Sequence, residues 1–183
     1  MEEREELRLE LQDDQWPMEY TDYDRPNARA IVFDSEGWLY FVRARREDGF
    51  GIATLIETSG GGIEPGEKPE TAILRELREE LGAETEIVRK IGVVSDYYNL
   101  IHRHNVNHYF LCRALSFGEK RLTADEIESF HLSTLKLRYE EAAAEYERRA
   151  VTKIGILIAR RELPVLRRAG ELLGLTNRTG DGT

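Results

Sequence analysis

The residues of this chain best suited to chemistry lie in one short segment, a glycine-rich turn followed by a run of carboxylates. Glycines occupy positions 60–62, and Glu76, Glu79 and Glu80 follow in a helix-like stretch. Helix positions three and four apart share a face, so these three carboxylates converge. Carboxylates so close to one another repel unless a cation lies among them. Ligands that offer only oxygen atoms suit a hard divalent ion such as Mg²⁺ or Mn²⁺. The spacing therefore predicts a metal site on this helix.

The residues around the carboxylates suit the same chemistry. Arg75 lies next to Glu76 and four positions before Glu79, so its guanidinium can orient a carboxylate through a charge-assisted hydrogen bond. The glycines let the backbone approach a ligand closely. The segment lacks the Lys-Ser or Lys-Thr pair of a P-loop, so a phosphate would be bridged by metal rather than held by lysine. The alternative is a solvated helix face stabilised by pairs of opposite charge.

The element that must position these residues is a helix beginning at Pro69. Proline suits the first helical position, Glu70 complements the positive end of the helix, and Gly82 suits the C-terminal cap. Apolar residues recur within it at helical spacing, at Ile73, Leu74, Leu77 and Leu81. We therefore expect a helix with an apolar face in the core.

Strand and helix patterns surround this helix and predict an α+β domain. We expect an N-terminal extension over 1–26, containing a short helix and packed by its aromatic residues, and one domain over 27–175. Residues from about 138 to 175 are predicted to be helical with a break at Pro164, and 176–183 to form a flexible tail. The predicted strands, the last two separated by a polar loop, cover residues 28–34, 38–45, 54–58, 86–95 and 106–115.

Composition and charge limit the class of protein. The chain has 183 residues, of which 40% are hydrophobic and 33% charged, enough for a sizeable core. No stretch approaches the length of a membrane span, and the acidic N-terminus lacks the apolar part of a secretory signal, so we expect a cytoplasmic protein without a membrane partner. The formal net charge of −9 argues against nucleic-acid binding through a broad basic face. Cys112, the single cysteine, is interpreted as a buried apolar filler.

The segment from Gly61 to Ala83 resembles the signature of the Nudix hydrolase family. That signature is a glycine, five residues, a glutamate, seven residues, then Arg-Glu, an apolar residue, any residue, Glu-Glu, any residue, glycine and an apolar residue. The chain matches it without a gap at Gly61, Glu67, Arg75, Glu76, Leu77, Glu79, Glu80, Gly82 and Ala83. We call this matched segment the box. Just before it, many family members carry a proline where this chain has Ser59, and we expect this difference to have little effect on the chemistry.

The resemblance implies a Nudix-like α/β/α sandwich with a mixed sheet, a glycine loop–helix motif and extra C-terminal helices. It also implies hydrolysis of a nucleoside diphosphate linked to another group, with Mg²⁺ or Mn²⁺ as cofactor. Glu79 and Glu80 would be core metal ligands together with the Gly60 carbonyl, and Glu76 a further ligand or the base. The supporting residues that fix the helix and loop would be Glu67 and Arg75.

The residues predicted to contact the substrate lie outside the box. Tyr98 and Arg103 belong to segment 96–110, whose tyrosines and arginine suit base stacking or phosphate contact. Arg43 could attract a phosphate at the end of its strand, or simply make that strand end soluble. By analogy with family members that recruit a glutamate from another loop, Glu126 is a further candidate ligand or base, with a surface role as the alternative.

Two further patterns have structural interpretations. Three histidines, His102, His104 and His108, could suggest a transition-metal site, but strand alternation favours a half-buried role for His108. An apolar stripe in the C-terminal helix favours core packing, with a homodimer face as the alternative: Val151, Ile154, Leu157 and Ile158.

The predicted function is metal-dependent hydrolysis of a pyrophosphate bond in a small-molecule nucleotide, with a nucleoside triphosphate, canonical or oxidised, as the favoured substrate. ADP-ribose or a nucleotide sugar is the alternative substrate. A non-catalytic nucleotide-sensing domain is the alternative from a different class. Specificity resides in loops, so the residues alone leave the substrate and the identity of the base open.

Overall fold

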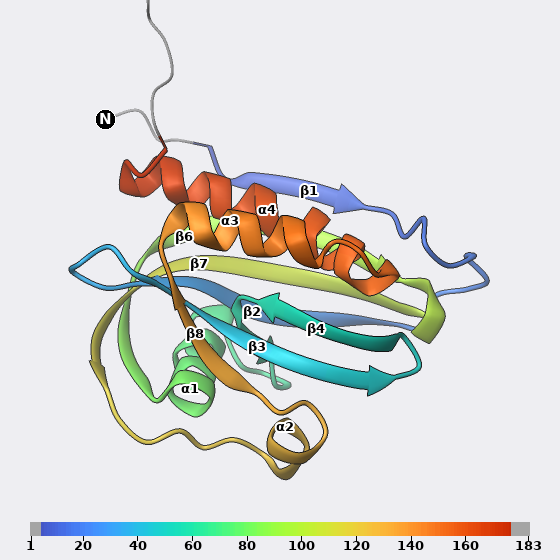
Figure 1. The fold of residues 1–183 in the computed structure, drawn as a ribbon, viewed down its shortest axis with the longest axis horizontal. Helices are drawn as coiled ribbons and strands as arrows, with labels where there is room; N and C mark the ends of the chain where they lie inside the picture. Colours follow the sequence, from blue (N-terminus) through green and yellow to red (C-terminus); the bar gives the residue numbers. More distant parts are fainter. Residues whose placement is uncertain (1–4, 177–183) are drawn as a thin grey trace, which may run out of the picture.

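A mixed β-sheet with helices on both faces organises residues 5–176, the part of the chain that the computed structural model describes (Figure 1). Within that part the strands are β1 (Leu7–Leu11), β2 (Tyr23–Phe33), β3 (Leu39–Asp48), β4 (Gly51–Glu57), β5 (Ser59–Gly62), β6 (Ala83–Tyr98), β7 (Arg103–Phe117) and β8 (Ser133–Leu137). The helices are α1 (Pro69–Leu81), α2 (Ala124–Glu128), α3 (Tyr139–Arg149) and α4 (Lys153–Leu173). The predicted tail, from residue 177 onward, lies outside the described residues.

The sheet follows the order β1-β6-β7-β2-β3-β4, with β5 paired to β2 and β8 to β3. The β1/β6 and β2/β7 pairs are parallel, and the remaining pairs are antiparallel. The parallel register sets Arg25 of β2 opposite Asn105 of β7, and Arg29 opposite Tyr109. This pairing brings together polar residues about eighty positions apart in the chain. The predicted α+β fold with a mixed sheet is confirmed.

Alternation along the strands divides the apolar core into two layers. Ala28, Ala30 and Val32 of β2 belong to a cluster that includes the buried face of α1. Ile31 belongs instead to the cluster formed with α3 and α4. Figure 1 shows the same division, with α3 and α4 across one face of the sheet and α1 beneath the other. Successive strand residues point to opposite faces, so each half-apolar strand contributes to both layers.

The N-terminal extension forms a strand, and the predicted short helix is wrong. Residues 7–11, with the sequence LRLEL, alternate apolar and charged residues, a period of two that favours a strand over a helix. This strand pairs in parallel with β6. Asp13 accepts a hydrogen bond from the Asn99 backbone N–H at 2.8 Å, and Trp16 packs edge-on to Phe50 at 5.3 Å. The predicted aromatic packing therefore holds for Trp16, whereas Tyr20 is 55% exposed.

The polar segment between the two long strands is shorter than predicted. The two strands continue until Tyr98 of β6 pairs with Arg103 of β7, and a short 3₁₀ turn over Asn99–Ile101 connects them. His102 completes the turn in the left-handed conformation, with φ of 55°. The periodicity of apolar residues predicts a loop here, whereas polar side chains occupy the strand positions at this end of the sheet.

The helical C-terminus breaks before α4 and not at Pro164. Thr152 caps α4 by accepting a hydrogen bond from the Gly155 N–H at 3.1 Å. A Cβ atom at Gly155 would lie 2.1 Å from the Arg149 carbonyl oxygen, so the close turn between α3 and α4 requires glycine. Pro164 lies inside α4, where Glu162 before it and Val165 after it are both buried. Burial of the helix on both sides of the proline outweighs the lost backbone hydrogen bond.

The apolar stripe of the C-terminal region is core. Ile154, Leu157 and Ile158 are buried against the sheet, whereas Val151, which precedes α4, is 80% exposed. Among the described residues, no helix is long and apolar enough to cross a membrane.

Candidate active site

The carboxylates of interest are presented by α1, whose ends are defined by local chemistry. Pro69 occupies the start of the helix, and Gly82 ends it in the left-handed conformation with φ of 64°. Ile73 and Leu77 are fully buried against the sheet. The predicted helix therefore holds, and its packing fixes which way the glutamates point.

Arg75 fastens the glycine loop to this helix. Its guanidinium donates from Nε and Nη2 to the two carboxylate oxygens of Glu67, at 3.0 and 2.9 Å, and from Nη2 to the Gly62 carbonyl at 3.1 Å. Its Nη1 atom donates to Glu76 at 2.7 Å and to Glu79 at 3.3 Å. These hydrogen bonds hold the pKa of Glu67 down at about 2. Arg75 thus orders the loop and two of the predicted metal ligands together.

Glu80 anchors the other side of the loop. Its Oε2 atom accepts hydrogen bonds from the Ser59 hydroxyl at 2.5 Å and from the Gly60 N–H at 2.9 Å. Burial raises the pKa of Glu80 to about 7, and these two hydrogen bonds oppose that rise. Ser59 therefore has a role that the sequence analysis missed: its hydroxyl orients the Glu80 carboxylate, which a proline could not do.

The glycine loop must pass this close to the helix. A Cβ atom at Gly61 would lie 2.7 Å from the carboxylate carbon and both oxygens of Glu76, and one at Gly60 would lie 2.1 Å from the Ala28 carbonyl oxygen. Gly60 also has φ of 146°, a conformation that favours glycine. A side chain at either position would displace β2 or Glu76.

The donor set fits a hard divalent cation. Glu76, Glu79 and Glu80 supply only oxygen ligands, and burial together with the charges of Glu79 and Glu126 raises the pKa of Glu76. Carboxylates whose ionisation is opposed by burial and by one another are stabilised by a bound cation. Within residues 5–176, no three His, Cys, Asp or Glu side chains already converge as a ligand group. The carboxylates are instead engaged by Arg75, Ser59 and Gly60, which hold them at the loop.

A pocket of about 300 Å³ opens beside Gly60, Gly61 and Glu80. The predicted substrate residues Tyr98, Arg103 and Glu126 line it. Arg43 does not: it lines a separate cavity and donates to the Ser133 hydroxyl at 3.3 Å. Glu126 is half-buried on α2 and accepts a hydrogen bond from the Thr123 N–H at 2.7 Å, which closes a capping box. Its charge nonetheless faces Glu76, whose pKa it helps to raise.

Most of the polar lining of this pocket was not predicted from the sequence. These residues come from β2, β4, β7, α4 and the position between β4 and β5: Arg25, Asn27, Arg29, Glu57, Thr58, Asn105 and Arg161. Their signal in the sequence is a polar residue at every second position, in RPNAR of β2 and RHNVN of β7. Recognising it required the register between the two strands, which only the sheet supplies.

Behind the pocket, a buried charge network joins the sheet to α4. Arg161 is 1% exposed and donates to carboxylates on β4 and β6, to Glu57 at 3.0 Å and to Asp96 at 3.2 Å. It also donates to the Tyr98 hydroxyl at 2.8 Å. Glu57 in turn pairs with Arg29 at 3.4 Å. The network forms the floor of the pocket and fixes the sheet residues that line it.

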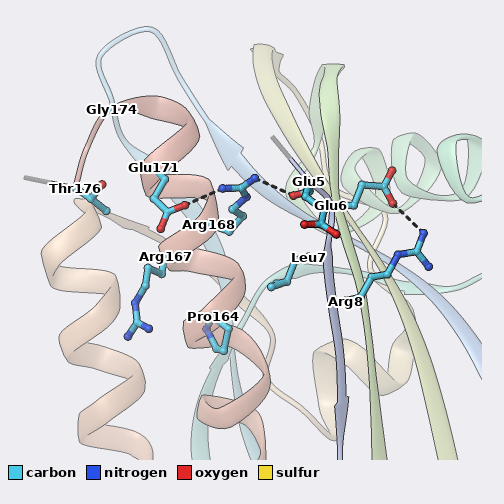
Figure 2. Close-up of a pocket in the computed structure, with 10 residues that line it drawn as sticks. All are labelled: Glu5, Glu6, Leu7, Arg8, Pro164, Arg167, Arg168, Glu171, Gly174 and Thr176. Carbon is cyan, nitrogen blue, oxygen red and sulfur yellow. Dashed lines mark hydrogen bonds and ion pairs between the residues drawn. The ribbon is translucent and has the colours of Figure 1, made fainter. Parts of the chain in front are cut away.

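A larger groove, of about 1140 Å³, lies elsewhere, between the start of β1 and the C-terminal half of α4 (Figure 2). Figure 2 shows Arg168 directed to Glu171 and to Glu5, and Arg8 directed to Glu6. None of the box residues lines this groove. Volume alone therefore does not identify the site. The candidate site is instead the smaller pocket, because it adjoins the box residues and the glycine loop.

The histidines of segment 96–110 do not form a metal site in the described part of the chain. His104 contacts Asp24 at 2.8 Å and stacks on Tyr97, and His102 stacks on Tyr20. Burial lowers the pKa of His108. Cys112 is fully buried, and burial raises the pKa of its thiol to about 12, as expected for an inert filler.

Comparison with known proteins places this geometry in context. A family model described as the NUDIX domain matches residues 24–153. An RNA pyrophosphohydrolase of Hydrogenovibrio crunogenus is 29% identical over 99 residues, which cover 54% of this chain and 55% of the relative. An ADP-ribose pyrophosphatase of Bacillus subtilis is 33% identical over 127 residues, which cover 69% of this chain and 65% of the relative. The chain thus matches between about half and two thirds of the length of these relatives.

Solved structures share the fold. The crystal structure of a MutT protein from Methanosarcina mazei Go1 superposes with a TM-score of 0.60 at 14% identity, covering 86% of this chain and 99% of the other. At that identity the similarity concerns the arrangement of the sheet and helices alone.

Proposed function

The chain belongs to the Nudix family, and from this premise we propose that it hydrolyses a pyrophosphate bond in a nucleoside diphosphate linked to another group, using a divalent metal ion. The observation that carries the proposal is the arrangement around the glycine loop. Glu76 and Glu80 lie against Gly61 and Gly60, and a pocket lined with arginines opens beside them.

The proposed roles follow from the contacts of each residue. Glu76, Glu79 and Glu80 hold the cation, with the Gly60 carbonyl as a further ligand. When bound, the cation supplies charge neutralisation of the pyrophosphate and a more acidic water. Arg75 keeps two of the carboxylates and the loop in register through its hydrogen bonds to Glu67 and Gly62. The proton acceptor is one of Glu76, Glu79, Glu80 and Glu126. Glu80 and Glu126 line the pocket and Glu76 lies against the loop, whereas Glu79 contacts Arg75 and lines a separate cavity.

The favoured substrate is a nucleoside triphosphate, canonical or oxidised. The pocket is lined by five arginines and three glutamates, so its surplus of positive charge suits a polyphosphate: Arg25, Arg29, Arg46, Arg103 and Arg161, with Glu57, Glu80 and Glu126. The ring of Phe130 offers an apolar surface for a base. The net charge of −9 favours a free nucleotide over a long nucleic acid.

A second candidate substrate is ADP-ribose. It is favoured by the Bacillus subtilis relative, whose name states that substrate and whose match covers more of this chain than that of the RNA pyrophosphohydrolase. A nucleotide-sensing domain without turnover is the remaining alternative, and the presence of every box glutamate argues against it.

The test is a product assay over a panel of nucleotides with Mg²⁺ and then with Mn²⁺. The panel holds canonical and 8-oxo nucleoside triphosphates, a 5′-triphosphorylated oligonucleotide, ADP-ribose, nucleotide sugars and diadenosine polyphosphates. Glu80→Gln serves as the blank. Glu70→Gln, an exposed carboxylate in the first turn of the same helix, is the matched control and should keep the wild-type rate. Full turnover by Glu80→Gln would refute the proposed role, and binding without turnover would favour the sensor.

A further inference from the structure

The pocket contains buried hydrogen-bond donors without acceptors. Asn105 is 2% exposed and lines the pocket, and its Nδ2 atom has no partner among the described residues. The Nε atom of Arg103, two positions earlier on β7, is likewise buried without a partner there. A buried donor left unpaired is costly, so these groups indicate a ligand that supplies acceptors.

Arg25 adds an unneutralised charge beside them. It lies opposite Asn105 in the sheet register, and its Nη2 atom is 3.6 Å from the position of a Cβ atom on Gly62 of the glycine loop. Neither Arg25 nor Arg103 forms an ion pair with a carboxylate in residues 5–176. Partial burial and the neighbouring charge of Arg103 lower the pKa of Arg25. The repulsion between two neighbouring guanidinium groups is relieved when an anion binds to both.

The other arginines of the pocket differ, because each already has a carboxylate partner. Arg29 and Arg161 share Glu57, at 3.4 and 3.0 Å, and Arg46 pairs with Asp48 at 2.7 Å. The free positive charge is therefore confined to the part of the pocket formed by the ends of β2 and β7 nearest the glycine loop.

We propose that Arg25, Arg103 and Asn105 bind a third phosphate group of the substrate, beyond the pyrophosphate that faces Glu76 and Glu80. The subsite offers donors and two positive charges, which an ionised phosphate satisfies and a neutral sugar or base does not. This inference rests on the proposed function and sharpens it: a chain of three phosphates is preferred over a diphosphate linked to an uncharged group.

The experiment compares two inorganic probes that differ by one phosphate. Isothermal titration calorimetry measures the affinities of Mg²⁺-tripolyphosphate and Mg²⁺-pyrophosphate, with phosphate release followed in the same samples. We expect wild type to bind tripolyphosphate about tenfold more tightly, the equivalent of one charge-assisted hydrogen-bonded contact. Arg103→Gln and Asn105→Ala should reduce this preference to about one while changing pyrophosphate affinity about twofold or less.

The matched control is Arg167→Gln, which removes an exposed arginine from α4, outside this pocket, and should leave the preference intact. Circular dichroism and the denaturation midpoint show whether each variant is folded, and Arg103→Lys provides a second, milder variant of the same site. The proposal is overturned if wild type shows no preference, or if Arg103→Gln and Arg103→Lys weaken both probes equally.

Failure of this inference is distinguishable from failure of the proposed function. A tripolyphosphate preference that depends on Arg103, with no turnover across the nucleotide panel, would leave the subsite standing and refute the hydrolase. Turnover on the nucleotide panel, with no tripolyphosphate preference in wild type, would do the reverse.

Discussion

Two arginines gather carboxylates in this molecule, one on α1 and one on α4, and their surroundings differ. The side chain of Arg75 is 26% exposed, and that of Arg161 is 1% exposed. The carboxylates around Arg75 are Glu67, Glu76 and Glu79. Those around Arg161 are Glu57, Asp96 and Glu162.

The difference in exposure separates two uses of the same ion-pair chemistry. Around Arg161, the side chains are largely shielded from water and also engage two tyrosines: Tyr98 accepts from Arg161, and Tyr109 donates to Glu162. Around Arg75, the side chain of Glu79 stays 40% exposed. Carboxylates outnumber the arginine in both networks, so access to water is what differs: a closed network fixes the fold, whereas an open one can take up a cation.

The largest expected effect breaks the closed network. Arg161→Met leaves the buried Asp96 and Glu162 and the half-buried Glu57 without their common partner, and should lower the free energy of unfolding by about 3–5 kcal/mol. Arg160→Met removes the neighbouring arginine, whose pair with Asp14 is exposed, and should change the free energy of unfolding far less. Urea denaturation measures both. Equal effects of the two substitutions would contradict the distinction between the buried and the exposed arginine. If Arg161→Met does not fold, Arg161→Lys is measured in its place.

Glu80, which hydrogen-bonds to the glycine loop and not to Arg75, should affect activity more than stability when it is changed. Glu80→Gln keeps the shape and burial of the side chain, so the denaturation midpoint should change little. Loss of the carboxylate should lower turnover of the substrate identified by the panel by about a hundredfold or more. Steady-state kinetics and denaturation of the same preparation test this, and a variant that loses stability in proportion to activity would indicate a structural role.

Arg75→Gln should have an intermediate effect. It releases Glu67 and the loop, while Glu79 stays open to solvent and Glu80 keeps its own hydrogen bonds to the loop, so we expect a smaller loss of stability than for Arg161→Met. Affinity for Mn²⁺, measured by electron paramagnetic resonance, should fall about 10- to 100-fold, because Arg75 orients the predicted ligands. An unchanged Mn²⁺ affinity would mean that Arg75 positions only the glycine loop and not the predicted metal ligands.

Glu80, which contacts neither Arg75 nor Arg161, should give the stability a pH dependence of its own. In the folded chain the pKa of Glu80 is about 7, above its ordinary value of 4.5, so the folded state binds more protons than the unfolded state between these values. In metal-free buffer, stability should therefore fall as pH rises from about 4.5 through 7, and Glu80→Gln should lack this component. Denaturation of both proteins in chelator at pH 5 and pH 8 tests the sign.

The smallest expected effect concerns Cys112, which belongs to neither network. Because burial raises the pKa of its thiol to about 12, the native chain should react negligibly with iodoacetamide between pH 7 and 9 and fully once denatured. Mass spectrometry of this single-cysteine chain gives a direct reading. Rapid native alkylation would show that the sheet opens on the α1 side.

Much of the open network could be predicted from the sequence because its contacts are local. Arg75 reaches partners one, four and eight positions away. Helical periodicity with a proline start and a glycine cap places Glu79 on its face of the helix, and Glu67 lies in the loop just before that helix. The glycine spacing likewise belongs to one continuous segment. For these residues, the physics of a single helix and its preceding loop is sufficient.

Only the tertiary structure decided the rest of the site. Ser59 meets Glu80 across 21 positions, and Arg161 meets Glu57 across 104. Arg25 and Asn105 are neighbours because β2 and β7 pair in parallel with one particular register. Such contacts depend on which strands pair and which faces are buried, and sheet register is set by the packing of the whole core rather than by any local pattern. The sequence alone therefore determined the chemistry carried by α1, and the sheet determined the charge lining of the pocket that it faces.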